Sequence, residues 1–534
     1  MAARPAEAEQ ARQAAPPAPR PAAPSLSQFS MFSSNAAGAR HLRAPMVPLN
    51  RERYQQFADN PLRVAAEHPV STFSIDVDTG AYANVRRFLN NGRLPPKDAV
   101  RVEEMLNYFR YDYAAPPSRE QPFRASVAQM QTPWNAGTRL VRIGIQGFRL
   151  TPESLPPANL VFLIDVSGSM NDPAKLGLLK AGLKMLARQL RRVDTVSIAV
   201  YAGSSGVVLP PTPGDRTATI EQALGQLRPG GSTNGAAGIK LAYQLARQNF
   251  LRRGINRVLL ATDGDFNVGT VDFQSLKGMV ERERRTGVSL TTLGFGTGNL
   301  NEQLMEQLAD TGDGNYAYID SAREAHKVLV QQMAGTLATI AKDVKIQVEF
   351  NPATVAEYRL IGYENRSLKR EDFNNDNVDA GEIGAGLGVT ALYEVTLHGS
   401  PAVRVDPLRY SRPETDAMGA TSGELAWLRI RYKHPQGNNS RLIEQPVDVT
   451  IGRGDNVGSD LRFAAAVAGF GQLLRGGRYT GQFAMDDVVA LANSARGDDP
   501  RGYRAEFIQL ASLAGRLLPG AGRRGERDPQ VVHR

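Results

Sequence analysis

A regular alternation of short apolar segments with amphipathic segments, between residues 159 and 342, most constrains the fold of this chain. The apolar strand candidates lie at 159–165, 196–202, 206–210, 257–263, 288–296 and 315–320. Between the first two, leucines recur at spacings of three and four, at Leu176, Leu179, Leu183, Leu186 and Leu190. This spacing predicts a helix with one buried face. Buried strands that alternate with helices predict an α/β fold with a doubly wound, mostly parallel sheet.

On both sides of this region the apolar period changes to two, which is typical of strands. Strand candidates at 123–131 and 138–148 precede it, and others at 344–350, 355–363, 389–397 and 424–432 follow it. Two strands with one apolar face are not stable alone. We therefore expect the strands before the central region (125–131 and 140–147) to pair with strands after it, such as 344–350, in one flanking β-sandwich.

Helical periodicity marks the remaining folded parts. Residues 71–117 predict a strand and turn followed by two short helices, and residues 460–518 contain three C-terminal helix candidates. The Ala- and Pro-rich N-terminus and the Gly- and Arg-rich C-terminus predict disorder. The predicted organisation is a leader (1–60), a companion domain (61–120), flanking strands (121–157), the central domain (158–341), a β-rich domain (342–435), a helical part (436–518) and a basic tail (519–534).

Composition excludes several classes of function. The chain has 534 residues, no Cys and a formal net charge of +9. The absence of Cys excludes disulfides, zinc thiolate sites and thiol catalysis. Much of the positive charge lies at the two ends, and no basic run is interleaved with aromatic residues, so we expect no nucleic-acid partner. No apolar stretch is long enough to predict a transmembrane segment, and residues 1–24 lack the apolar core of a secretory signal.

Oxygen-bearing side chains mark one edge of the predicted central sheet. Asp165, Ser167 and Ser169 follow the first strand as a DxSxS motif. Thr233 lies in a Gly-rich loop just before a helix, and Asp263 closes the strand at 257–263. The carboxyl ends of the strands of such a sheet meet at a topological switch point, so we expect the five side chains to converge there. Two carboxylates and three hydroxyls suit a small hard cation, Mg²⁺ or Mn²⁺.

With these residues in this order, the region resembles the von Willebrand factor type A family. The family motif is DxSxS, a later Thr and a strand-terminal Asp, and all five positions match. The resemblance implies a metal-ion-dependent adhesion site in which Ser167, Ser169 and Thr233 are inner-shell ligands. It also implies that Asp165 and Asp263 act mostly through water, and that one coordination position stays open for an Asp or Glu of a protein partner.

The flanks resemble a narrower bacterial group, in which the type A domain has an N-terminal companion domain and a C-terminal domain of unknown function. The resemblance rests on the stretches 73–89, 94–109, 358–386 and 461–471. One departure is Leu387, where the group leads us to expect His. The group implies a cell-envelope or periplasmic location. This N-terminus shows no signal peptide or lipid-anchoring cysteine, so a cytoplasmic location also stays open.

A second acidic motif invites other interpretations. Asp76 and Asp78, within DVDTG, resemble part of a phosphatase nucleophile motif. Asp78-Thr-Gly80, with Asp310-Thr-Gly312 as a second copy, resembles the paired DTG triplets of aspartic proteases. We expect instead that Asp76 and Asp78 cap the following helix, and that Gly312 ends the preceding one. A cation bound by Asp76 and Asp78 is a further alternative.

The two main hypotheses differ in one requirement. A cation-dependent binding or scaffold protein needs only the open metal position, whereas a metal-dependent hydrolase needs a base within reach of a bound water. The sequence indicates no such base, and no Walker A loop is present. We therefore expect a binding protein without catalytic residues, with its partner-binding residues unknown and a metal-dependent hydrolase as the alternative.

Overall fold

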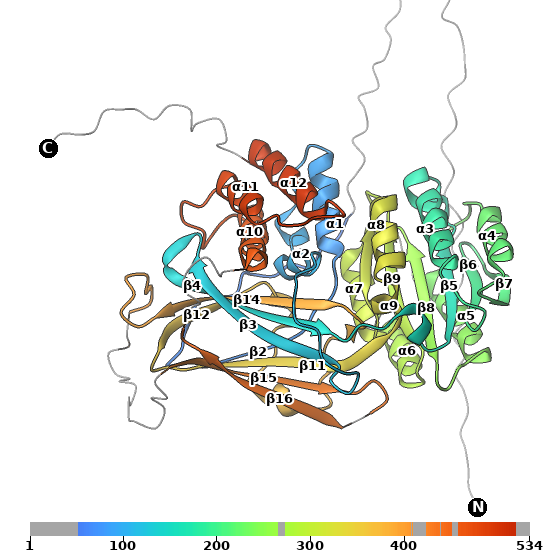
Figure 1. The fold of residues 1–534 in the computed structure, drawn as a ribbon. Coiled ribbons are helices and arrows are strands. Elements are labelled where there is room, and N and C mark those ends of the chain that lie inside the picture. The colour runs from blue at the N-terminus through green and yellow to red at the C-terminus, as the bar shows by residue number, and fades with distance from the viewer. Residues whose placement is uncertain are drawn as a thin grey trace, which may run out of the picture. The chain divides into compact units, whose positions relative to one another are not determined.

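The central region forms a six-stranded sheet in a computed structural model that describes residues 52–264, 273–406, 408, 423–437, 439–450 and 458–518. The strand order is β10-β9-β8-β5-β6-β7, and every strand is parallel to its neighbour except β7. The strands are β5 (Ala158–Asp165), β6 (Thr195–Tyr201), β7 (Ser205–Pro213), β8 (Ile255–Thr262), β9 (Ser289–Phe295) and β10 (Tyr316–Ile319). The predicted doubly wound, mostly parallel sheet is confirmed (Figure 1).

Helices cover both faces of this sheet. They are α3 (Leu178–Ala187), α4 (Thr217–Gln226), α5 (Gly235–Gln248), α6 (Phe273–Arg285), α7 (Glu302–Thr311), α8 (Ala322–His326) and α9 (Met333–Leu337). Alternate residues of β5 face opposite sides, so Phe162 packs with α3 and α4 while Leu163 packs with α5 and α6. The leucine-rich helix ends at Ala187, before the last leucine of the predicted buried face, Leu190, and α4 was not predicted.

Two further sheets form the flanking β-sandwich, around one apolar core. The first sheet has the order β1-β12-β14-β4-β3, and the second has the order β13-β11-β15-β16 with β2 paired to β11. The strands are β1 (Arg63–Val64), β2 (Val70–Ser74), β3 (Phe123–Thr132), β4 (Asn135–Gly147), β11 (Thr339–Phe350), β12 (Val355–Ile361), β13 (Ile383–Gly384), β14 (Gly388–Leu397), β15 (Glu424–Lys433) and β16 (Ser440–Asp448).

The central region is an insertion into this sandwich. Strand β4 precedes it and pairs with β14, which follows it, with Ile143 opposite Ala391. The prediction that the two flanks share a sheet is therefore confirmed. The predicted pairing with the strand at 344–350 was wrong. This strand belongs to β11, which pairs with β2 and β15 in the second sheet.

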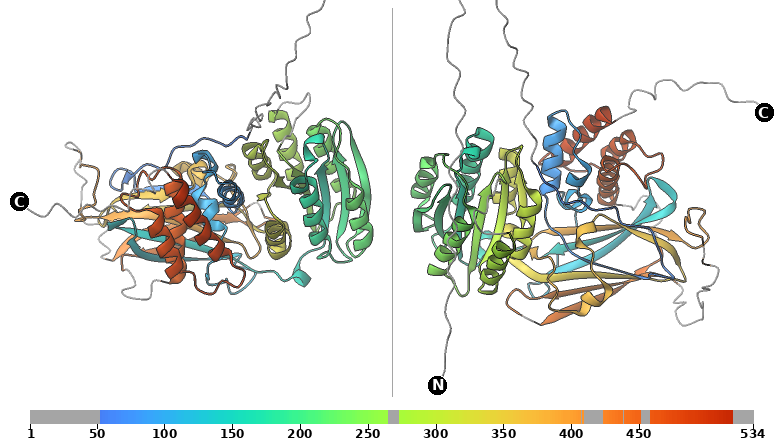
Figure 2. Two further views of the ribbon diagram at one scale, coloured as in Figure 1. Left: turned by 90° about the horizontal axis from the view of Figure 1, so that it is seen from above. Right: turned by 180° about the vertical axis from the view of Figure 1, so that it is seen from behind.

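Helices from the two ends of the chain form one layer against the sandwich (Figures 1 and 2). They are α1 (Gly80–Asn90), α2 (Val102–Asn107), α10 (Ser459–Leu474), α11 (Met485–Ser494) and α12 (Tyr503–Leu517). Tyr82, Val85 and Leu89 of α1 share the predicted buried face, and they pack in one cluster with Phe463 of α10 and Phe507 of α12. The helices predicted as parts of two separate regions thus share a core.

The folded region begins before the predicted boundary at residue 60. Glu52 forms an ion pair with Arg87 (2.8 Å), and Asp59 forms one with Arg475 (2.7 Å). Residues 1–51 of the predicted leader and the predicted tail (519–534) lie outside the described residues. Within the described part of the chain, no helix combines the length and apolarity needed to cross a membrane.

Candidate metal site

Four of the five predicted ligands lie where two adjacent parallel strands end. Asp165 is the last residue of β5, and Asp263 directly follows β8. The register pairs Ile164 with Ala261, so both aspartates lie at the carboxyl edge of the sheet. Ser167 and Ser169 follow in the next loop, and their Oγ atoms lie 3.0 Å apart.

The Asp165 carboxylate organises this edge. Its Oδ1 accepts a hydrogen bond from the Ser167 backbone N–H (2.9 Å), and its Oδ2 accepts from the hydroxyls of Thr262 (2.9 Å) and Tyr201 (3.2 Å). Burial raises the pKa of Asp165, and the nearby Asp263 carboxylate raises it further. Because these donors occupy its oxygens, Asp165 orients the serine loop and is suited to an outer-shell role.

The loop that carries Thr233 is held beside the serine loop by backbone hydrogen bonds. Gly230 N–H donates to the Val166 carbonyl (2.7 Å), and Gly168 N–H donates to the Gly231 carbonyl (3.1 Å). Gly231 has a φ of +88°, a conformation that glycine adopts without strain. The Thr233 side chain is partly exposed, at the start of α5. The structure thus joins the two loops that the sequence predicted to meet.

A lysine that the sequence did not indicate completes the polar edge. Lys175 Nζ lies 2.8 Å from Asp263 Oδ2 and 3.2 Å from Asn299 Oδ1. Asp263 is fully buried, so its charge requires compensation by a cation. The stem of Lys175 packs against Gly296, where the close approach leaves no room for a side chain. Lys175 lies in a single turn of π-helix at Pro173–Gly177, and nothing in its sequence context predicts its contact with Asp263.

The oxygen set fits a small hard cation. The two serine hydroxyls are close enough to share one ion, and every predicted ligand is a hard oxygen donor, which suits Mg²⁺ or Mn²⁺. Among the described residues, the hydrogen bonds of Asp165, Ser167 and Ser169 come from hydroxyls and a backbone N–H, and none involves His. The described part of the site therefore offers oxygen ligands that suit an ion, and no histidine base lies among the groups that contact them.

The expectation that Asp76 and Asp78 cap α1 was wrong. The N-cap residue is Thr79, and the N–H of Ala81 in the first turn donates to the Glu104 carboxylate (2.8 Å). Asp76 accepts from the Asp78 backbone N–H (2.8 Å), and Asp78 accepts from the Tyr316 backbone N–H (2.9 Å). The two aspartates therefore order their own loop and attach it to β10, because Glu104 already occupies the helix end.

The two DTG triplets meet at one arginine. Arg366 lies 3.7 Å from Asp78 Oδ2 and 2.7 Å from Asp310 Oδ2. Gly312 is the C-cap of α7, as predicted. The carboxyls of an aspartic protease share a proton across a short gap. A guanidinium group that contacts both Asp78 and Asp310 is incompatible with that arrangement, so the protease interpretation fails.

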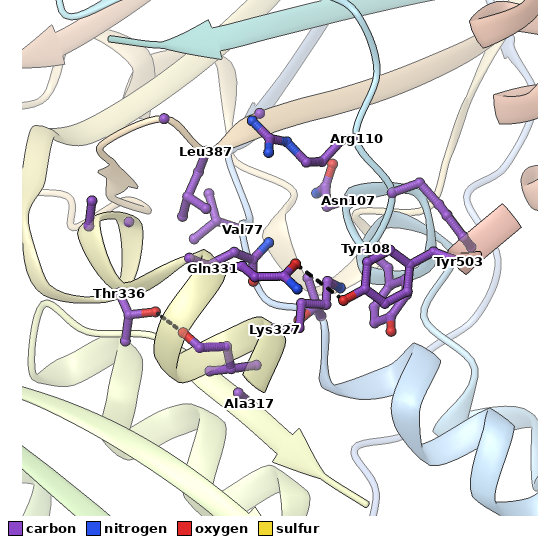
Figure 3. A pocket seen from close by; sticks show the side chains of 18 of the residues that line it. Val77, Asn107, Tyr108, Arg110, Ala317, Lys327, Gln331, Thr336, Leu387 and Tyr503 are labelled. Atoms are coloured by element: carbon purple, nitrogen blue, oxygen red, sulfur yellow. Dashed lines mark hydrogen bonds between the residues drawn. The ribbon is translucent and has the colours of Figure 1, made fainter. Parts of the chain in front are cut away.

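A cavity of about 450 Å³ lies at the junction of the sandwich, the helical layer and the end of the central region. Its wall includes Lys327, whose Nζ is buried against the ring of Tyr108, and Gln331, which accepts a hydrogen bond from the Tyr503 hydroxyl (3.3 Å; Figure 3). Burial lowers the pKa of Lys327 to about 7. Leu387, at the position where the resemblance led us to expect His, also lines this cavity.

Three family models match consecutive parts of the chain. The model described as von Willebrand factor matches residues 48–142, the von Willebrand factor type A domain matches 159–332, and the C-terminal model of the uncharacterized protein YfbK matches 335–517. A type A domain indicates a protein-interaction or adhesion-type function. The predicted resemblance to the type A family is therefore confirmed.

Similar proteins extend this result. The uncharacterized protein YfbK of Escherichia coli (strain K12) is 50% identical over 484 residues, which are 90% of this chain and 83% of that protein. Inter-alpha-trypsin inhibitor heavy chain H3 of Rattus norvegicus is 29% identical over 30% of this chain and 19% of its own length. A solved structure of a von Willebrand factor type A protein from Catenulispora acidiphila is 14% identical, with a TM-score of 0.40, over 73% of this chain and 89% of its own.

Proposed function

Because this chain belongs to the family of the Escherichia coli protein YfbK and contains a type A domain, we propose that it binds a protein partner through a divalent cation at the edge of the central sheet. Ser167, Ser169 and Thr233 contact the cation directly, and Asp165 and Asp263 act from the outer shell. The observation that carries this proposal is the pair of serine hydroxyls 3.0 Å apart, on a loop that Asp165 holds in place.

The chemistry of the site favours Mg²⁺ or Mn²⁺. Neutral hydroxyl ligands leave most of the positive charge of the ion uncompensated, so an Asp or Glu of the partner gains a strong interaction at the remaining position. The partly exposed positions of Ser169 and Thr233 leave this side of the ion accessible. The partner supplies the carboxylate, which makes recognition dependent on the cation.

Lys175 has a defined role in this proposal. Its ammonium group compensates the buried charge of Asp263. A cation held at the serines adds positive charge beside the same carboxylate, so Lys175 and the ion compete for the electrostatic stabilisation that Asp263 offers. Lys175 therefore stabilises the buried Asp263 carboxylate when no ion is bound, and it lowers the affinity of the site for the ion.

We propose binding and not hydrolysis. A metal-dependent hydrolase requires a base within hydrogen-bond reach of a metal-bound water. The groups that contact Asp165 and the serines are hydroxyls and backbone groups, and each has an evident orienting role. Among the described residues of this edge, no contact favours the hydrolase.

The experiment compares partner capture by the full chain in Mg²⁺ and in EDTA, followed by calorimetry with the recovered partner. We expect Ser167→Ala to lower the affinity at least 10-fold in Mg²⁺ with an unchanged circular dichroism spectrum, because a ligand is lost from the rim and not from the core. Ser205→Ala is the matched control, since this exposed serine begins β7 at the same edge. Equal affinities in Mg²⁺ and in EDTA would contradict the proposal.

A further inference from the structure

A second group of potential cation ligands lies in the interior, away from the edge with the serines. Asp76 follows β2, Glu104 lies on α2 and Glu306 lies on α7. Each brings one carboxylate oxygen into a group whose members all lie within 4.8 Å of one another. All three residues are almost fully buried, with exposed fractions of 3%, 0% and 2%. Carboxylates this deep in a protein are rare unless their charge is compensated.

The cations around this group do not compensate its charge. Arg101 pairs with Glu306 and lies 3.4 Å from Glu104, and Arg366 pairs with Asp76 (3.2 Å) and Glu306 (3.2 Å). The carboxylates that interact electrostatically with these two arginines are more numerous, namely Asp76, Asp78, Glu104, Glu302, Glu306 and Asp310. If all are ionised, the cluster keeps a negative excess in a buried place.

Several oxygens in this cluster have no hydrogen-bond donor among the described residues. Both carboxylate oxygens of Glu302 lack a donor, as does Glu306 Oε2. Glu104 Oε1 lies 3.4 Å from Arg101 Nε but makes no hydrogen bond with it. Glu302 is fully buried and lies four residues before Glu306, so the two side chains share one face of α7. Buried carboxylate oxygens normally have donors. These unpaired oxygens are an observation independent of the spacing of the three carboxylates, and a bound cation would contact them.

We propose that Asp76, Glu104 and Glu306, with Glu302 beside them, bind a Ca²⁺ ion in the interior. Two oxygens on one Ca²⁺ ion lie at most about 4.6 to 5.2 Å apart, twice the usual bond length, so the observed spacing permits a shared ion. Several carboxylates in one place favour Ca²⁺, whereas Mg²⁺ usually takes one or two and keeps its waters. Asp310, which also contacts Arg366, has a side chain that is 39% exposed and lies at the solvent side of the cluster.

Another group of three carboxylates shows the contrast. Asp313, Asp379 and Glu382 also lie within ligand distance of one another. There, Arg284 contacts Asp313 (3.1 Å) and also pairs with Asp379, and Lys342 lies 2.5 Å from Asp313. No Asp313 or Glu382 oxygen is among the buried atoms that lack a donor in the described region, and Asp379 is exposed to solvent. We therefore expect no cation at this group, and a substitution in it is a control for the interior site.

The position of the interior site gives it a structural role. Asp76 and Glu104 belong to the segment before the central sheet, whereas Glu306 and Glu302 belong to α7, which packs on that sheet. A bound ion therefore joins the N-terminal segment to the type A domain. Occupancy stabilises this junction and does not require a partner protein.

The test uses the full chain with the edge site disabled by Ser167→Ala, so that failure of the edge proposal does not affect the outcome. After removal of metals with EDTA, ⁴⁵Ca²⁺ equilibrium dialysis and thermal unfolding are measured at pH 7.5. We expect about one Ca²⁺ per chain and a rise in melting temperature of about 2 to 6 °C in Ca²⁺. The effect should be larger than that of equimolar Mg²⁺.

Two variants of the cluster keep the test decisive. Glu306→Gln should abolish Ca²⁺ binding, but it also weakens the pairs with Arg101 and Arg366. Glu302→Gln breaks no described hydrogen bond, so we expect it to fold, to melt in EDTA at the same or a higher temperature, and to bind Ca²⁺ at least 10-fold more weakly. Glu382→Gln should keep the full Ca²⁺ response.

Three results would overturn the proposal. The first is no Ca²⁺ binding by the Ser167→Ala chain. The second is an unchanged Ca²⁺ response in both Glu302→Gln and Glu306→Gln. The third is a melting temperature that does not change with Ca²⁺ and falls as the pH rises from 6 to 9. Such a fall would mean that the buried carboxyls hold protons in place of a cation, because they lose those protons in this range.

Discussion

The serine edge of the central sheet and the interior carboxylate cluster offer oxygen ligands in opposite settings. At the edge, most of the candidate ligands are neutral hydroxyls. The buried carboxylate of Asp263 there forms an ion pair with Lys175. In the interior, carboxylates outnumber the two arginines that contact them. If both proposals hold, exposure and charge separate two roles: the low-charge rim presents an ion to a partner, and the high-charge interior uses an ion to hold two segments together.

The largest effect is expected where the interior cluster loses a cation. Arg366→Leu removes the guanidinium that contacts Asp76, Glu306 and Asp310, so these buried carboxylates repel one another. We expect the free energy of unfolding to fall by about 3 to 5 kcal/mol in EDTA, measured by urea denaturation. Arg285→Ala, which removes an exposed pair with Glu281, should cost at most about 0.5 kcal/mol. Similar small losses in both variants would mean that the cluster is not ionised.

Lys327 is a buried cation, so its removal measures the cost of burying a charge of the opposite sign. Its pKa falls to about 7 by burial, against the attraction of Glu324 and Glu506 and with repulsion from Arg86 and Arg323, while Tyr108 and Tyr503 form its apolar surroundings. The unfolded chain therefore binds more protons between pH 7 and about 10.5, and stability rises with pH across that window.

The corresponding variant is Lys327→Met, which keeps the length of the side chain without the amine. We expect it to stabilise the protein by roughly 2 to 4 kcal/mol at pH 6, and the gain should shrink toward zero near pH 10. Urea unfolding at pH 6, 8 and 9.5 measures this trend. A gain that does not change with pH would show that Lys327 keeps its ordinary pKa.

At the edge, the effect should appear in cation affinity and not in folding. Asp263→Asn keeps the shape of the side chain but removes the charge that attracts the ion from the outer shell. We expect the Mg²⁺ affinity to fall about 10- to 100-fold, measured by calorimetry, with an unchanged circular dichroism spectrum. The same substitution should leave Ca²⁺ binding at the interior cluster unaffected. A parallel loss at both sites would mean that the two regions are coupled.

The smallest effect concerns Lys175. Lys175→Met removes the ammonium group that lies 2.8 Å from the buried Asp263 carboxylate. We expect the free energy of unfolding to fall by about 1 kcal/mol in EDTA, and the deficit to disappear in saturating Mg²⁺, because the ion then supplies the missing positive charge. Lys184→Met, on α3 of the same helical segment, is the control, because no hydrogen bond or ion pair of the Lys184 ammonium group is described. A deficit that persists in Mg²⁺ would show that Lys175 stabilises packing and not the charge of Asp263.

Much of the fold was predictable because it depends on local periodicity. The strands β5, β6, β8, β9 and β10 and the helices α10 to α12 lie close to the predicted ranges. The buried leucines of one helix, such as Leu179, Leu183 and Leu186, recur three or four residues apart, so a short stretch of sequence is enough to predict the helix and its buried face. The helix α4 was missed, and the pairing of 344–350 was wrong, because strand partners are chosen by contacts between distant segments.

The sequence by itself determined the type A domain, its doubly wound sheet and the five oxygen-bearing residues at one edge, because a strand that ends at Asp165 or Asp263 places its last side chain at a known side of a parallel sheet. Only the tertiary structure decided that Lys175 contacts Asp263, and that Asp76, Glu104 and Glu306 lie together. These residues are far apart along the chain, and each has an ordinary local context. Their contacts arise because the N-terminal segment packs on α7 and a helical turn packs on the sheet edge. The spacing of apolar residues along the chain does not predict such packing.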